Sequence, residues 1–125
     1  MFSKMLGGRD EAIYPSNELG DELYRAFPDP SKIPAQAIIW FDIYFDDEAD
    51  ADALADDFET RGFEINRDFD EDNGDEDLGP WNVDAQYAIK PEYRLLRAAV
   101  DEMLAKVETA RGKLASVVIS PIDDD

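Results

Sequence analysis

The chain has 125 residues, which is long enough for one domain and too short for two. Hydrophobic residues make up 44 % of it, which is enough for a packed core. Its 31 acidic and 12 basic residues give a formal net charge of −19, which disfavours nucleic acids and anionic membranes as direct ligands and favours a basic protein partner. The absence of cysteine and histidine excludes disulfides, Cys/His metal sites, thiol nucleophiles and catalysis by histidine.

Residues 1–34 are expected to form an N-terminal leader that carries one short helix. Residues 1–9 lack the apolar centre of a signal peptide, and no stretch reaches the roughly 18 apolar residues that span a bilayer, so a cytoplasmic location is expected. Ser16 is the candidate cap of an amphipathic helix over 17–27. The prolines that follow this helix predict an extended connector.

Residues 35–125 are expected to form the folded domain, which begins with a strand over 36–45 rich in β-branched and aromatic residues. One face of this strand is apolar, and the other carries Trp40, Asp42 and Tyr44. An aromatic pair of this kind resembles the platform of RNA-recognition modules, but such platforms need basic surroundings. We expect instead that the N-terminal helix lies across this face and buries Trp40 and Tyr44.

A helix with alanine, leucine and phenylalanine on one side and acids on the other is predicted over 49–61. Asp46 or Asp47 is its candidate N-terminal cap, and Gly62 stands where a C-terminal glycine belongs. A second strand is predicted directly afterwards, over 63–69.

A third strand is predicted over 81–90, followed by the longest helix, which Pro91 opens and Gly112 ends, and by a last strand over 114–122. After the short N-terminal helix, the element order is therefore βαββαβ. This order predicts an α+β domain of the ferredoxin-like kind, with one antiparallel sheet and two helices on one of its faces.

Residues 42–77 hold 17 acidic residues and two basic ones, which makes this segment the main candidate site. The acidic loop over 70–79 does not have the spacing of an EF-hand; loose binding of a divalent ion stays open, and no cofactor is expected. We predict that acids of the loop and of the preceding helix form a partner-binding surface. Its residues are Asp52, Asp56, Glu59, Asp70, Glu71, Asp72, Asp75, Glu76 and Asp77.

Two segments carry a resemblance to a known family. The run over 38–45, Ile-Ile-Trp-Phe-Asp-Ile-Tyr-Phe, leads into the alanine-rich helix, and Arg-Gly-Phe-Glu-Ile over 61–65 precedes the acidic turn, a tryptophan-containing strand and a long helix. From residue 36 to about 112 the chain resembles the ribonuclease E inhibitor family, also called regulator of ribonuclease activity B. The resemblance implies a small acidic bacterial cytoplasmic protein that binds the endoribonuclease initiating RNA decay and lowers its activity on some transcripts.

The sequence therefore predicts a regulator without catalysis of its own, which binds a basic protein, an endoribonuclease, through its acidic surface. An immunity protein or nucleic-acid mimic that blocks the basic site of a toxin nuclease would share the same physics and is the alternative. A third hypothesis is an enzyme that uses carboxylates and a divalent ion. A catalytic carboxylate needs burial or a close like charge, and Asp42 is the one acid inside an apolar strand, which makes this hypothesis the least favoured.

Overall fold

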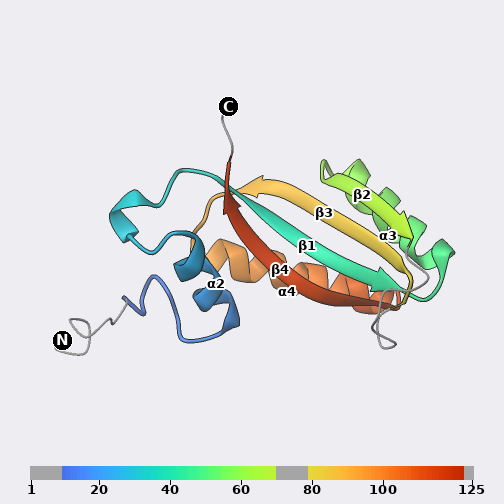
Figure 1. Cartoon of the computed structure of the whole chain (residues 1–125), viewed down its shortest axis with the longest axis horizontal. Coiled ribbons are helices and arrows are strands. Elements are labelled where there is room, and N and C mark those ends of the chain that lie inside the picture. The colour runs from blue at the N-terminus through green and yellow to red at the C-terminus, as the bar shows by residue number, and fades with distance from the viewer. Residues whose placement is uncertain (1–9, 70–78, 123–125) are drawn as a thin grey trace.

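The computed structural model describes residues 10–69 and 79–122, and within them it contains an α+β fold, as predicted. Four strands form one antiparallel sheet in the order β2-β3-β1-β4, and three α-helices and a short 3₁₀ helix accompany it (Figure 1). The elements are α2 (Glu18–Ala26), η1 (Pro30–Lys32), β1 (Ala37–Phe45), α3 (Glu48–Thr60), β2 (Glu64–Phe69), β3 (Trp81–Ile89), α4 (Tyr93–Thr109) and β4 (Gly112–Pro121).

Strand β1 lies in the middle of the sheet, between β3 and β4. Phe41 pairs with Ala85 of β3 and with Val117 of β4, and both pairings are antiparallel. The register against β4 shifts between Asp42 and Ile43, which marks a bulge in the sheet. A central position explains the apolar composition of β1, because both of its edges are hydrogen-bonded and one of its faces is fully buried.

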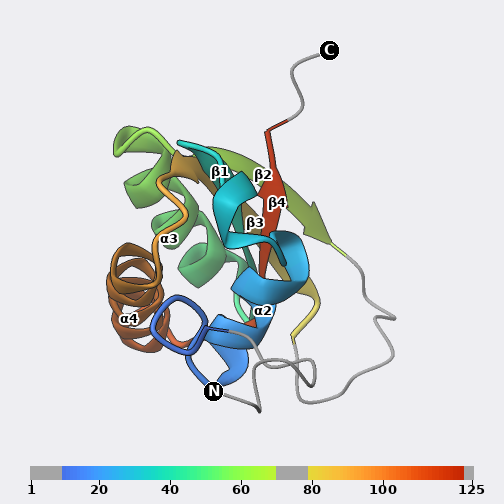
Figure 2. The same ribbon diagram turned by 90° about the vertical axis from the view of Figure 1, so that its left-hand side faces the viewer.

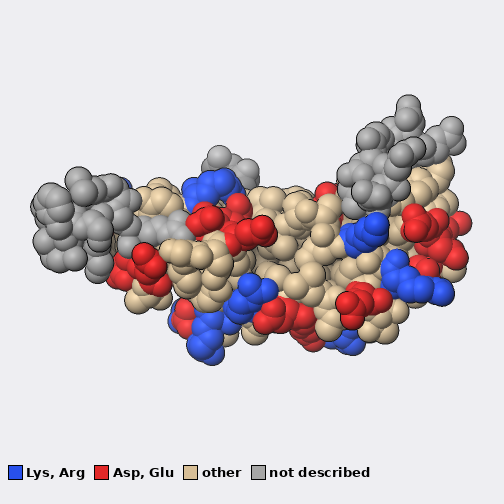
Figure 3. Space-filling view, turned by 90° about the horizontal axis from the view of Figure 1, so that it is seen from below, with Lys and Arg blue, Asp and Glu red and all other residues tan. Residues whose placement is uncertain are grey.

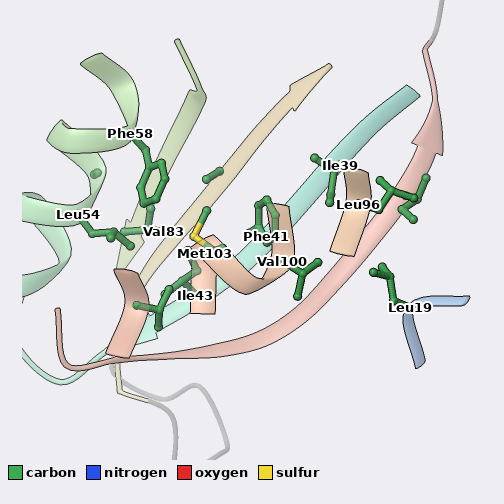
Figure 4. Packing of buried hydrophobic residues seen from close by; sticks show 14 of the residues in the cluster. Leu19, Ile39, Phe41, Ile43, Leu54, Phe58, Val83, Leu96, Val100 and Met103 are labelled. Atoms are coloured by element: carbon green, nitrogen blue, oxygen red, sulfur yellow. The ribbon is translucent and has the colours of Figure 1, made fainter. Parts of the chain in front are cut away.

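The core lies between the sheet and the two longer helices, which cover the same side of the sheet (Figure 2). The apolar side chains on the helix-facing side of β1 are at most 1 % exposed, and they pack against the apolar stripes of α3 and α4 (Figure 4). The amphipathic patterns of these helices therefore predict the buried faces, except that Leu104, which also falls in the apolar stripe of α4, is 44 % exposed. The central side chains are Ile39, Phe41, Ile43, Leu54, Phe58, Leu96, Val100 and Met103.

Helix α2 packs at the edge of β4 and does not cover the opposite face of the sheet. The Glu22 carboxylate accepts a hydrogen bond from the Ile119 amide (Oε2 to N, 2.8 Å), and the Arg25 guanidinium donates to the Ile119 carbonyl (2.9 Å). Leu23 is fully buried in the core, because the apolar stripe of α2 turns toward the side of α4. The prediction that this helix buries Trp40 is wrong, since Trp40 is 36 % exposed.

The start of α2 differs by one residue from the prediction. Asn17, not Ser16, is the cap, because the Asn17 side chain accepts a hydrogen bond from the Gly20 amide at 2.8 Å. Gly20 is needed for close packing, since a Cβ atom there would lie 1.8 Å from the Pro15 carbonyl oxygen. In α3, by contrast, Asp47 is the cap as predicted, and it accepts from the backbone two residues on.

Both ends of α4 also differ from the prediction. The helix begins at Tyr93 and not at Pro91, because Glu92 still has extended backbone angles. It ends before Arg111, which adopts the left-handed conformation (φ 63°). Arg111, and not Gly112 as expected, is therefore the left-handed residue that follows the helix. Gly112 begins β4, where a Cβ atom would lie 2.5 Å from the Phe45 ring. In the described part of the chain, no helix is long and apolar enough to cross a membrane.

Candidate functional site

Three of the predicted partner-binding acids surround one arginine. Arg67 of β2 donates to Asp52 at 2.9 Å and to Asp56 at 2.7 Å, and its Nη2 atom lies 3.9 Å from Glu59 Oε1. Strand alternation explains this position, because Arg67 lies on the same face of β2 as Ile65, which packs against the core beneath α3. The hydrogen bonds to Asp56 and Asp52 raise the pKa of the Arg67 guanidinium.

We call Asp52, Asp56 and Glu59 the α3 acidic cluster. One guanidinium balances one of its three charges, and each carboxylate is about half exposed or more, so the cluster still presents negative charge to solvent. The structure thus brings together the three helix residues of the predicted surface. The other six, Asp70, Glu71, Asp72, Asp75, Glu76 and Asp77, lie outside the described residues.

Positive charge in the described part of the chain is largely used in internal ion pairs. Basic side chains lie directly beside acidic ones on the face shown in Figure 3. The unbalanced charge on the surface is therefore negative, and it attracts a positively charged partner. The paired bases are Arg25, Arg61, Arg67, Lys90, Arg94, Arg97 and Arg111.

A second candidate site lies on the sheet face opposite α3 and α4. Exposed apolar side chains gather there: Trp40 is 36 % exposed and Val118 is 40 % exposed. They border a shallow hollow of about 410 Å³ over β3, β1 and β4. We call this surface the open sheet face and define it by Trp40, Asp42, Tyr44, Asn82, Asp84 and Val118.

Two carboxylates meet in the centre of the open sheet face. Asp42 of β1 and Asp84 of β3 are directly opposite each other in the antiparallel register. Asn82 donates its side-chain amide to Asp42 Oδ1 (2.7 Å) and to the Ile43 carbonyl (3.0 Å). Burial, followed by the hydrogen bond to Asp42 and the charge of that group, raises the pKa of Asp84 to about 6, and the charge of Asp68 adds to the shift.

The sequence analysis noted Asp42 as the one acid inside an apolar strand, without assigning it to a site, and it missed Asp84. Asp84 alternates with the buried Val83 and Ala85, so the pattern alone places it on the outer face of its strand. Its contact with Asp42 depends on the β1–β3 register, which the sequence does not determine because α3, β2 and residues 70–80 separate the two strands. Among the described residues, no group of three or more acids is arranged to hold a metal ion.

Comparison with known proteins adds a family to this geometry. A family model described as regulator of ribonuclease activity B matches residues 27–115, which span β1, α3, β2, β3, α4 and the start of β4. A solved structure of a functionally unknown protein from Pediococcus pentosaceus ATCC 25745 is similar over 73 % of this chain and 95 % of its own, with 15 % identity and a TM-score of 0.39. No curated protein matches the chain.

Proposed function

Because the chain belongs to the regulator of ribonuclease activity B family, we propose that it binds and inhibits a ribonuclease and catalyses no reaction itself. One observation carries the finer part of this proposal: three half-exposed carboxylates on α3 share a single guanidinium, in a chain with a net charge of −19. A ribonuclease must carry basic surfaces to bind its substrate, and these attract such a cluster.

The proposed mechanism is electrostatic. Long-range attraction speeds the encounter with a basic partner, and the bound acidic surface then competes with RNA phosphates for the same positive charges. The α3 acidic cluster supplies part of the surface, and we assign the rest to Asp70, Glu71, Asp72, Asp75, Glu76 and Asp77 as part of the proposal.

The fold is consistent with a binding module. The strand order β2-β3-β1-β4, with α3 and α4 on one side, supports the finer proposal of a ferredoxin-like domain. In such an arrangement the helices bury one face of the sheet and leave their own outer sides and the second sheet face available for partners.

The direct test measures cleavage of a fluorescent RNA by the RNA-decay endoribonuclease of the same organism, with increasing amounts of this protein. We expect the wild-type chain to inhibit, and the neutral cluster variant Asp52→Asn/Asp56→Asn/Glu59→Gln to need about tenfold more protein for the same inhibition. Inhibition should also weaken as the salt concentration rises from about 50 to 300 mM, because ions screen exposed charges.

A matched control separates the cluster from net charge alone. Glu18→Gln/Asp101→Asn/Glu108→Gln makes the same change of charge on α2 and α4, and it should change the inhibition constant by about twofold or less. Absence of inhibition by the wild-type protein would refute the function. Equal effects of the two triple variants would refute the role of the cluster.

A further inference from the structure

We propose that the open sheet face binds an arginine side chain of a basic protein partner, with the guanidinium against Trp40 and bridging the carboxylates of Asp42 and Asp84. This inference rests on the proposed function, because that function requires a basic protein as the partner. It adds a short-range recognition site, on the far side of the sheet from α3, to the long-range attraction of the α3 acidic cluster.

The apolar part of the site is exposed and held in place. Trp40 and Val118 are neighbours across β1 and β4, and both are more than a third exposed. The indole Nε1 of Trp40 donates to Ser120 Oγ at 3.0 Å, which fixes the orientation of the ring. A ring held in this way loses little conformational freedom when a planar guanidinium stacks on it.

The polar part of the site lies within reach of the ring. Asp42 is two residues from Trp40 on the same face of β1, about 7 Å along the strand, and Tyr44 follows at the same spacing. Asp84 stands beside Asp42 on the neighbouring strand. Two adjacent carboxylates next to an aromatic face match the forked donors and the flat surface of arginine better than the single ammonium of lysine.

The two carboxylates also gain from a cation. Both are partly buried and face each other, which is unfavourable when both are charged. Asn82 satisfies one oxygen of Asp42, and a guanidinium would supply further donors to the pair. An arriving positive charge removes the repulsion that the pair experiences in the free protein.

The surrounding charges favour a basic protein over a nucleic acid. The register places Glu64 and Asp68 of β2 on the same face, beside Gln86 and Asn82 of β3. Among the described strand residues, Lys113 of β4, opposite Tyr44, is the one basic residue on this face. An aromatic surface surrounded by more acids than bases repels phosphates, although its rings would stack on RNA bases in a basic environment.

The test titrates the full chain with a hexa-arginine peptide and follows backbone amide shifts and tryptophan fluorescence. We expect the largest shifts at 40–44, 82–84 and 116–118, and an affinity for hexa-arginine about fivefold or more above that for hexalysine. Asp84→Asn and Trp40→Phe should each weaken binding of hexa-arginine about tenfold, whereas Glu108→Gln, the same loss of charge on α4, should weaken it about twofold or less. Amide spectra of the free variants that overlay on the wild type confirm that these proteins are folded.

Three results would overturn the inference. Shifts confined to the α3 acidic cluster would place the basic segment there and leave the proposed function intact. Shifts at Trp40 caused by oligouridylate and not by hexa-arginine would make the face a nucleic-acid site. Signals of the face that change on dilution, together with a dimer in light scattering, would assign it to a second copy. Failure of the wild-type chain to inhibit the ribonuclease, with peptide binding at the face retained, would refute the proposed function alone.

Discussion

Replacing Asp84 with asparagine should stabilise the protein at neutral pH and have little effect in acid. In the folded chain Asp84 faces the Asp42 carboxylate of β1 and experiences the charge of Asp68 of β2, while Asn82 on its own strand is the hydrogen-bond partner that favours its charged form. An asparagine at this position keeps a hydrogen-bond donor toward Asp42 and removes one of the two facing charges.

The size of the effect follows from the pKa of Asp84, which is raised from 3.8 to about 6. Each pKa unit corresponds to about 1.4 kcal/mol, so the shift amounts to about 3 kcal/mol before screening. Asp84 is only partly buried, and solvent screening reduces the expected gain to about 1–2 kcal/mol. Because the folded state holds this proton more tightly than the unfolded state, the contribution of Asp84 to stability falls as pH rises from about 4 to 6 and is constant above about 7.

Urea denaturation of the wild type and of Asp84→Asn at about pH 4 and pH 7.5 measures this contribution. The difference in free energy of unfolding between the two proteins should be near zero at the lower pH and about 1–2 kcal/mol in favour of the variant at the higher pH. Asp56→Asn serves as the comparison, because it removes a carboxylate that an arginine already balances, and it should not stabilise. An equal difference at both pH values, or a variant that is less stable at neutral pH, would refute the reasoning.

Three further substitutions test the packing. Arg67→Gln should lower the free energy of unfolding by about 1–2 kcal/mol at low salt, because three carboxylates lose their shared counter-charge, whereas Lys106→Gln on α4 should change it by less than about 0.5 kcal/mol. Gly20→Ala should destabilise by about 2 kcal/mol or more in thermal or urea unfolding, despite the better helix propensity of alanine, because the new Cβ atom would overlap the Pro15 carbonyl; a neutral or stabilising result would refute this close contact. Leu23→Ala should cost about 2–4 kcal/mol in the same assay, and a cost below about 1 kcal/mol would show that α2 contributes little to the core.

Hydrophobic periodicity was sufficient to predict most of the fold. The helix and strand positions followed from local patterns, since each element buries one face and its sequence shows the matching period of 3.6 or 2. The end of α4 was less predictable, because Arg111 adopts a backbone conformation that usually belongs to glycine. The predicted position of α2 is wrong for a different reason. Its apolar stripe could pack on either side of the sheet, and the hydrogen bonds with Ile119 of β4 favour the position that the structure shows.

The candidate sites depended on contacts between residues far apart in the sequence. Charge composition alone predicted the acidity of α3, but not that Arg67 would bind its acids, because that contact needs the packing of β2 beneath the helix. The Asp42–Asp84 pair needs the register of two strands whose centres, Phe41 and Ala85, are opposite each other and 44 residues apart in the sequence. The alternation of apolar and polar residues in each strand does not determine such a register when a helix, another strand and a further segment separate the two strands.

The contact of Glu22 and Arg25 with Ile119 has a consequence for the edge of the sheet that β4 forms. An exposed outer strand is a template on which a second chain can add its own strand, and here two side chains of α2 occupy both hydrogen-bonding groups of one such position on β4. Because α2 and β4 lie at opposite ends of the described sequence, these hydrogen bonds can form only after β4 has been synthesised. A nascent or locally opened chain without these contacts exposes the β4 edge, and protection of this edge against strand addition therefore depends on α2 staying docked.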